Sequence, residues 1–147
     1  MSTTPAFSTQ LIGQTEKTLN AILDRLLAGT GLTEQQWVTL TLAVMSGGAV
    51  DLSAFASRIA DGLKISDAEA RTRIDELAAA RFLEMSDADT SPVRVTDAGA
   101  ELHARIRTQV VEITGRMWGD LPAEDLAAAG RVLTTVLERA NAELGRA

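Results

Sequence analysis

Six stretches of the chain carry apolar residues at the three- and four-residue spacing that is typical of an α-helix. These stretches cover residues 9–28, 33–45, 53–63, 66–80, 96–118 and 122–144. Two of them begin with a capping box, Thr33 with Gln36 and Ser66 with Glu69. In such a box each side chain of the pair satisfies a free backbone N–H group at the start of the helix. The pattern therefore predicts a mainly helical protein.

Two short extended runs, Phe82–Met85 and Pro92–Val95, follow the fourth helical stretch. The residues between them, 86–91, favour turns, so the two runs are predicted to form a β-hairpin. Residues 49–52 are compatible with one further, very short strand. The predicted order is thus helix, helix, short strand, helix, helix, hairpin, long helix and helix.

The middle of the chain, residues 33–96, has enough apolar positions on its helices to fold around its own core. Each of its three helices presents a narrow apolar face at helical spacing. The residues predicted to be buried are Trp37, Leu40 and Val44 on the first, Phe55, Ile59 and Leu63 on the second, and Ala70, Ile74 and Leu77 on the third. This segment is predicted to be the central part of one domain that spans residues 9–147.

The outer helices carry apolar stripes but have little core of their own. On the longest one, the stripe consists of Ala98, Leu102, Ile106, Val110, Ile113 and Met117. Such stripes normally pack against one another or against a second copy of the chain. We therefore expect a homodimer formed by residues 9–30 and 97–147, with residues 1–8 as a flexible arm. The residues predicted for the dimer interface are Ile12, Leu19, Leu126, Leu133 and Leu137.

The composition narrows the classes of function. The chain has 147 residues and no cysteine, which excludes a disulfide scaffold, a cysteine-based zinc site and a thiol switch. It shows no signal-peptide pattern and no apolar run of about 18 residues, so we expect a cytoplasmic protein with no membrane partner. Phosphate-binding loops, nucleophile elbows and clusters of histidine with acidic residues are missing from the sequence. We therefore expect no enzymatic activity, no cofactor and no metal site.

The predicted helices 53–63 and 66–80 are joined by a tight turn at Lys64-Ile65 and followed by a hairpin. This order of elements is typical of a winged helix-turn-helix. In this motif the second helix enters the major groove of DNA, and its capped N-terminus points N–H groups at phosphate. Arg71 is then the candidate to contact a base edge, and Arg73 or Arg58 to hold a phosphate. The alternative is that the two arginines of this helix pair with neighbouring acidic residues on a solvated face. The acidic candidates are Asp67, Asp75 and Glu76.

Four sequence motifs, in their order and spacing, resemble those of the MarR family of transcription regulators over about residues 11–144. The motifs are Leu32-Thr33-Glu34-Gln35-Gln36-Trp37, Leu63-Lys64-Ile65-Ser66, Val93-Arg94-Val95-Thr96-Asp97-Ala98-Gly99 and Leu121-Pro122-Ala123-Glu124-Asp125. The resemblance implies a homodimer joined by its first and last helices, with two winged domains on a pseudo-palindromic DNA site. It also implies a small aromatic or lipophilic effector. The DNA-contacting residues that it implies, together with the helix geometry, are Arg58, Ser66, Asp67, Arg71, Thr72, Arg73 and Arg94.

The chain departs from the family pattern at positions that matter for DNA binding. No basic residue lies between Arg81 and Arg94, where the family has an arginine in the wing, and Arg81 stands where the family has a glycine. Residues 58–94 contain six basic and eight acidic side chains. Because contacts with phosphate supply most of the non-specific affinity, we expect weak DNA binding, binding at few sites, or none. The alternative function is a winged-helix dimer that has lost DNA binding and serves as a protein- or ligand-binding module.

Candidates for an effector pocket are few. They are Trp37, Leu40, His103 and Ile106, each of which is also compatible with an ordinary place in the core. The acidic turn at residues 87–91 resembles part of a calcium loop. Since Pro92 and Ala98 replace the glycine and the acidic residue that such a loop requires, a polar turn is the better interpretation.

Overall fold

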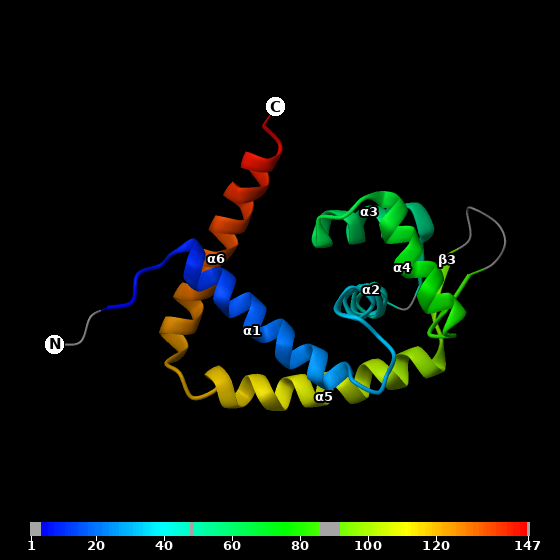
Figure 1. Cartoon of the computed structure of the whole chain (residues 1–147), viewed down its shortest axis with the longest axis horizontal. Coiled ribbons are helices and arrows are strands. Elements are labelled where there is room, and N and C mark those ends of the chain that lie inside the picture. The colour runs from blue at the N-terminus through cyan, green and yellow to red at the C-terminus, as the bar shows by residue number, and fades with distance from the viewer. Residues whose placement is uncertain (1–3, 48, 86–91, 147) are drawn as a thin grey trace. The chain divides into compact units, whose positions relative to one another are not determined.

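The computed structural model describes residues 4–47, 49–85 and 92–146. These residues form six helices and three short strands (Figure 1). The elements are α1 (Thr9–Leu27), α2 (Glu34–Met45), β1 (Ala49–Asp51), α3 (Leu52–Leu63), α4 (Asp67–Ala79), β2 (Leu83–Glu84), β3 (Pro92–Val95), α5 (Asp97–Trp118) and α6 (Ala123–Leu144). The chain divides into two compact units, residues 1–110 and 111–147. The predicted fold class is confirmed: a mainly helical protein with a small hairpin wing.

The helix starts follow from local capping, with two differences from the prediction. The first capping box forms completely, because Thr33 N–H donates to Gln36 Oε1 at 3.0 Å and Gln36 N–H donates to Thr33 Oγ at 3.3 Å. At α4, Glu69 N–H donates to Ser66 Oγ, but the Glu69 carboxylate accepts from the hydroxyl of Ser66 at 3.2 Å, which is not the predicted box. Helix α3 begins one residue earlier than predicted, since the carboxylate of Asp51 accepts from the backbone N–H of Ala54.

A three-stranded antiparallel sheet with the order β1-β3-β2 forms the wing. Ala49 and Val50 of β1 pair with Arg94 and Val93 of β3, so the short strand predicted after α2 is a member of the same sheet. The strand β2 is shorter than the predicted run 82–85, because its pairing with β3 includes only Leu83 and Glu84. The predicted turn over residues 86–91 lies outside the described residues.

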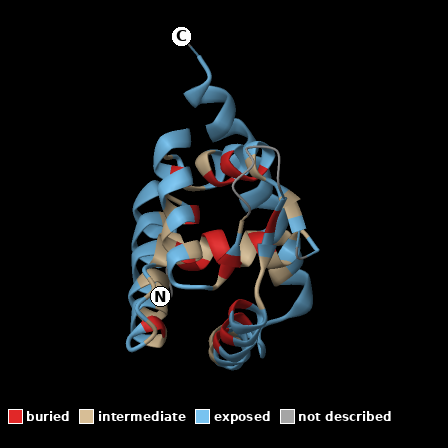
Figure 2. Ribbon diagram, turned by 90° about the vertical axis from the view of Figure 1, so that its right-hand side faces the viewer, coloured by how far each residue is buried: buried red, intermediate tan, exposed pale blue. Residues whose placement is uncertain are grey.

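The core of the first unit lies between α2, α3, α4 and the sheet, where the buried residues gather (Figure 2). The predicted face of α4 is confirmed, since Ala70, Ile74 and Leu77 are fully buried. The predicted faces of α2 and α3 are buried except at their C-terminal ends, where Val44 and Leu63 are half-buried against the core. A second, smaller cluster joins α1, α2 and the first half of α5. Its buried members are Leu27, Trp37, Leu102 and Ile106.

The first turn of α5 differs from the predicted stripe. Ala98 is exposed, and Gly99 is buried in its place. A Cβ atom at Gly99 would lie 2.2 Å from the backbone oxygen of Phe82. Helix α5 therefore contacts the backbone of Phe82, between α4 and β2, through a Cα atom that has no side chain. The spacing of apolar residues cannot predict such a contact. Among the helices that the structure describes, none has an apolar stretch long enough to cross a membrane.

Candidate nucleic-acid interface

Helices α3 and α4 form a helix-turn-helix through a turn at Lys64. This residue has the left-handed backbone conformation, with a φ of 59°, and Ile65 N–H donates to the backbone oxygen of Ala60 at 3.1 Å. Helix α4 then begins at its N-cap, Ser66, and buries the side of the helix that carries Ala70, Ile74 and Leu77. The predicted tight turn is confirmed, and the opposite side of α4 faces solvent.

The exposed side of α4 carries most of the predicted DNA-contacting residues. Ser66, Asp67, Arg71 and Thr72 are all exposed. Arg71 Nη2 lies 3.5 Å from Ser53 Oγ at the start of α3, a distance at the outer limit of a hydrogen bond. The hydroxyl of Thr72 donates to its own helix, at the backbone oxygen of Ala68. The guanidinium group of Arg71 is thus the most accessible positive charge on this helix.

Two further predicted residues are exposed on neighbouring elements. Arg58 on α3 donates from Nη1 to Ser46 Oγ at 2.9 Å, which connects the end of α2 to α3. Arg94 lies on the central strand β3 opposite Glu84 of β2. The structure therefore presents exposed arginines from α3, α4 and the wing, and each is accompanied by polar or acidic neighbours.

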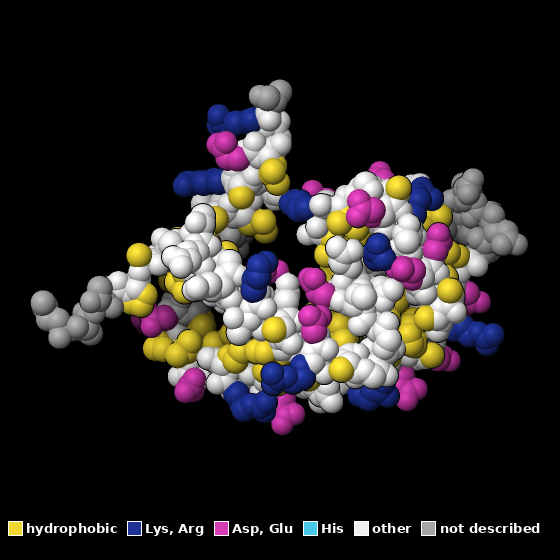
Figure 3. Space-filling model, viewed as in Figure 1, with side chains coloured by type: hydrophobic (Ala, Val, Ile, Leu, Met, Phe, Trp, Pro, Cys, Tyr) yellow, Lys and Arg dark blue, Asp and Glu magenta, His cyan; other side chains and the backbone are white. Residues whose placement is uncertain are grey.

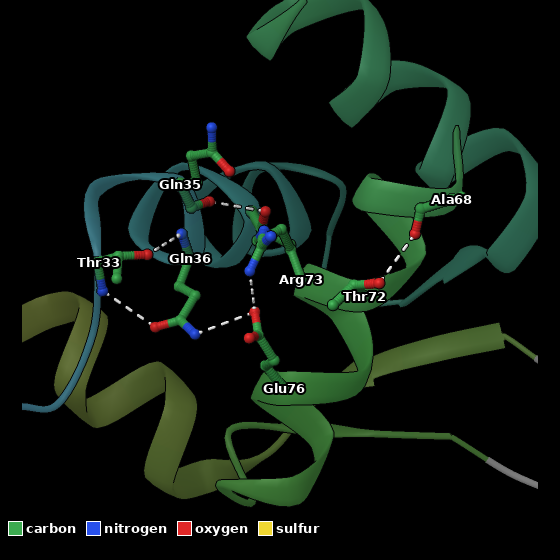
Figure 4. Close-up of polar contacts among 8 residues, drawn as sticks. Thr33, Gln35, Gln36, Ala68, Thr72, Arg73 and Glu76 are labelled. Carbon is green, nitrogen blue, oxygen red and sulfur yellow. Dashed lines mark hydrogen bonds and ion pairs between the residues drawn. The ribbon is translucent and has the colours of Figure 1, made fainter. Parts of the chain in front are cut away.

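Arg73 is the exception among the predicted DNA contacts, because its guanidinium group turns toward α2 (Figure 4). Its Nη1 atom forms an ion pair with Glu76 Oε1 at 2.5 Å, and only 24% of its side chain is exposed. Its Nε atom is buried and has no hydrogen-bond partner among the described residues. Of the two alternatives that the sequence leaves open for Arg73, pairing within the helix is the one present in the structure.

Glu76 connects this ion pair to α2. Its Oε1 atom also accepts a hydrogen bond from Gln36 Nε2 at 3.2 Å, and Gln36 is a member of the capping box with Thr33 (Figure 4). The hydrogen bond from Gln36 and the ion pair with Arg73 hold the pKa of Glu76 below its ordinary value, against the opposing effect of burial. A continuous chain of polar contacts thus runs from Thr33 at the start of α2 to Arg73 on α4.

Arg81 ends α4 in a conformation that glycine prefers. Its φ is 67°, Arg81 N–H donates to Ala78 O at 3.0 Å, and Phe82 N–H donates to Leu77 O at 2.9 Å. This is the Schellman arrangement, in which the residue after the helix is left-handed. The position corresponds to the family glycine noted in the sequence, and the exposed arginine retains the same backbone.

A hollow that no sequence pattern predicted lies beside Arg81. It has a volume of about 390 Å³. The residues that line it are Ala78, Arg81, Leu83, Glu84, Met85 and Thr96. It combines side chains from the end of α4, from β2 and from the residue before α5, so only the folded chain assembles it.

The comparisons with known proteins address the fold. No family model and no curated protein matches the sequence. Among solved structures, a MarR protein from Peptoclostridium difficile has a TM-score of 0.76 at 16% identity, with 97% of each chain covered. The MepR–DNA complex of Staphylococcus aureus has a TM-score of 0.75 at 16% identity, with 91% of this chain and 98% of that chain covered. BpsR of Bordetella bronchiseptica has a TM-score of 0.68 at 23% identity, with coverage of 92% and 99%.

The chain has the MarR fold. The resemblance inferred from the four sequence motifs is confirmed at the level of the fold. In the MarR fold of this chain, α3 and α4 are the helix-turn-helix, α4 has the position of its second helix, and the sheet β1-β3-β2 is the wing. Structural neighbours include transcriptional regulators.

Three of the four candidates for an effector pocket come together in this MarR fold. The rings of Trp37 and His103 stack with centroids 4.9 Å apart, and Ile106 lies in the same cluster. Leu40 is buried in the other cluster, against α3 and α4. Burial, and to a smaller extent the positive charge of Arg107, lowers the pKa of His103 from its ordinary value, so the imidazole is neutral within the stack.

Among residues 4–47, 49–85 and 92–146, no three acidic or histidine side chains are arranged to hold a metal ion.

Proposed function

We propose that the chain is a transcription regulator that binds a pseudo-palindromic DNA site as a homodimer and responds to a small lipophilic or aromatic ligand. The observation that carries this proposal is the recognition helix α4. It buries one side in the core, begins at a hydroxyl cap, and presents Arg71 and Thr72 to solvent beside a three-stranded wing. A helix exposed in this way fits the major groove, and an arginine on it can form paired hydrogen bonds with guanine.

Two of the similar structures support this proposal through what they bind. MepR was solved in a complex with DNA, and DNA binding by BpsR is regulated by 6-hydroxynicotinic acid. Both share their fold with this chain over nearly their whole length. A regulator of this kind has no need of catalysis or of a cofactor, and we place it in the cytoplasm with its DNA.

Exposed apolar side chains support the homodimer. On α6, Leu133 and Leu137 expose 47% and 59% of their surface. Further exposed apolar side chains in the terminal segments are Phe7, Leu11, Val111, Trp118, Leu121, Val132 and Leu144. The other three predicted interface residues, Ile12, Leu19 and Leu126, are half-buried. Because soluble proteins rarely leave so much apolar surface uncovered, we propose that a second copy of the chain covers these residues.

The proposal is tested by selecting bound duplexes from a random pool and measuring the affinity of the best site by fluorescence anisotropy. Arg71→Ala should lower the affinity for that site by about 1–3 kcal/mol, because a paired contact with a base is lost. The control is Arg105→Ala, which removes an exposed arginine from α5. Failure to enrich any sequence at low salt, or equal losses in the two variants, would contradict the proposal.

The effector is proposed to act at the Trp37–His103 stack. Since His103 is only 6% exposed, a ligand that enters there has to displace the stack and change the fluorescence of Trp37. A titration with a panel of aromatic carboxylic acids tests this. The response should disappear in Trp37→Phe, which retains Trp118 as the remaining tryptophan. A ligand that releases DNA while both tryptophan signals stay constant would place the effector elsewhere.

The charge balance favours a second candidate function, a winged-helix module without DNA binding. Basic and acidic side chains are interspersed over the visible face of the wing and of helices α3 and α4 (Figure 3), and residues 58–94 carry more acidic than basic groups. The double substitution of Asp87→Arg and Asp89→Arg distinguishes the two. If the segment between β2 and β3 reaches DNA, the variant should bind more tightly. No change in affinity would favour the module.

A further inference from the structure

The recognition helix has only two basic residues, Arg71 and Arg73, and the structure places them in different surroundings. Arg71 is exposed, whereas Arg73 is mostly covered and paired with Glu76. Four acidic residues share the same helix, Asp67, Glu69, Asp75 and Glu76. Which of the two arginines can neutralise a DNA phosphate therefore depends on what holds each guanidinium group.

We propose that Glu76 determines the specificity of DNA binding by holding Arg73 away from the phosphates, so that α4 binds DNA through Arg71. This inference rests on the proposed function and adds a residue that does not itself contact DNA. Glu76 is a positioning residue. Its ion pair keeps Arg73 from binding phosphates independently of the sequence, whereas Arg71 remains available to contact a base.

Two contacts and the low exposure of the side chain explain why Arg73 stays with Glu76 when DNA approaches. The ion pair between Nη1 and Oε1 is short and lies in a partly buried site, where charge-assisted hydrogen bonds are strong. Only 24% of the Arg73 side chain is exposed, so apolar packing against the protein also holds it in place. If Arg73 left, Glu76 would retain the hydrogen bond from Gln36 but lose its ion pair with Arg73 in that partly buried site. The exchange of Glu76 for a phosphate therefore offers little gain.

The position of Glu76 is fixed from α2 as well as from its own helix. Gln36 Nε2 donates to the carboxylate, and Gln36 Oε1 accepts from Thr33 N–H (Figure 4). Gln36 thus has both ends of its amide occupied and cannot easily turn away. The same bridge that fixes Glu76 also connects the start of α2 to the recognition helix across 40 positions of the sequence.

The test is the salt dependence of binding to a mixed-sequence duplex that contains no selected site. Each phosphate contact adds about 0.9 to the slope of log affinity against log salt. Glu76→Gln releases the charge of Arg73 but keeps an oxygen that can accept from Gln36. It should therefore steepen the slope by about 0.9 for each protomer, so that the ratio of affinities between about 50 and 200 mM salt grows roughly 3.5-fold per protomer, or about 12-fold for the proposed dimer.

Two variants separate this effect from a general change of charge. Asp75→Asn removes an exposed carboxylate from the next position and should leave the slope unchanged. The double variant Arg73→Gln with Glu76→Gln replaces the ion pair by a neutral pair and should retain the wild-type slope. Urea denaturation of every variant confirms that it is folded.

The outcomes distinguish this inference from the proposed function. Equal slopes for Glu76→Gln and Asp75→Asn would overturn the inference. A slope that falls by about 0.9 per protomer in the double variant would also overturn it, because Arg73 would then contact phosphate in the wild type. If none of the proteins binds any duplex at low salt, the proposed function fails and the inference fails with it.

Discussion

The close approach of α5 to the backbone of Phe82 makes Gly99 the most sensitive of the described glycines in the first unit. An added Cβ atom would lie 2.2 Å from Phe82 O and 3.1 Å from Phe82 C, both of which are backbone atoms. No side-chain rotation relieves such a contact. In Gly99→Ala the first turn of α5 has to move away from Phe82 by about 1 Å to restore a normal van der Waals distance.

Hydrogen bonds at the same place set the cost of that movement. Thr96 N–H donates to Phe82 O at 3.1 Å, and Thr96 Oγ donates to Arg81 O at 2.7 Å. Forcing extra volume into a packed site costs about 1–3 kcal/mol. Weakening the two hydrogen bonds adds about 1 kcal/mol, and the higher helix propensity of alanine returns up to about 1 kcal/mol. The free energy of unfolding should therefore fall by about 2–3 kcal/mol.

Gly62→Ala is the matched control, since it makes the same chemical change on another helix. Gly62 lies in α3, and no heavy atom comes within 4 Å of its added Cβ. The substitution should raise the free energy of unfolding by about 0.5–1 kcal/mol. Urea denaturation followed by far-UV circular dichroism, at one protomer concentration, measures both variants. The reasoning is refuted if Gly99→Ala is as stable as the wild type, or if the two variants shift in the same direction.

Three other changes test the structure. Arg81→Gly should raise the free energy of unfolding by about 0.5–1 kcal/mol, because it removes a left-handed Cβ, whereas Arg81→Ala should not; thermal melts compare the two. His103 is neutral in the fold because its pKa is lowered from 6.5, so its contribution to stability is complete above that pH and is lost as the pH falls below it. His103→Phe, which keeps a ring beside Trp37, should lose less stability between about pH 7.5 and pH 5.5 than the wild type, as urea midpoints would show. A double substitution of Leu133 and Leu137 by glutamate should convert the proposed dimer to a monomer in light scattering, and a dimer that persists would place the interface elsewhere.

The sequence predicts the helices and the main core because both depend on local spacing. The apolar faces of α3 and α4 repeat at three and four residues, and each of their buried positions is a large or methyl-bearing side chain. The burial of Gly99 was not predicted, because a residue without a side chain does not contribute to an apolar pattern. Its burial results from a contact with Phe82, and that contact exists only after the hairpin has brought the two segments together.

The candidate site was predictable in its position but not in its partners. The order of two helices and a hairpin identified α4 and its exposed Arg71. For Arg73, however, the sequence offered three acidic candidates on its own helix, and the position of Glu76 depends also on an amide that comes from Gln36 on α2. The stack of Trp37 on His103 is likewise a contact between distant segments, which a single sequence does not reveal.

The strand β3 lies in the middle of its sheet, between β1 and β2. The pairing of β3 with β1 and the connection between β2 and β3 therefore differ in how much mutation they tolerate. Ala49, Val50 and Asp51 hold β3 from one side, independently of the hairpin connection on the other. The alignment of β3 with the core is therefore preserved when the connection between β2 and β3 is lengthened, shortened or given a different charge. Changes in the length or charge of this connection can accordingly accumulate one by one while the domain stays folded.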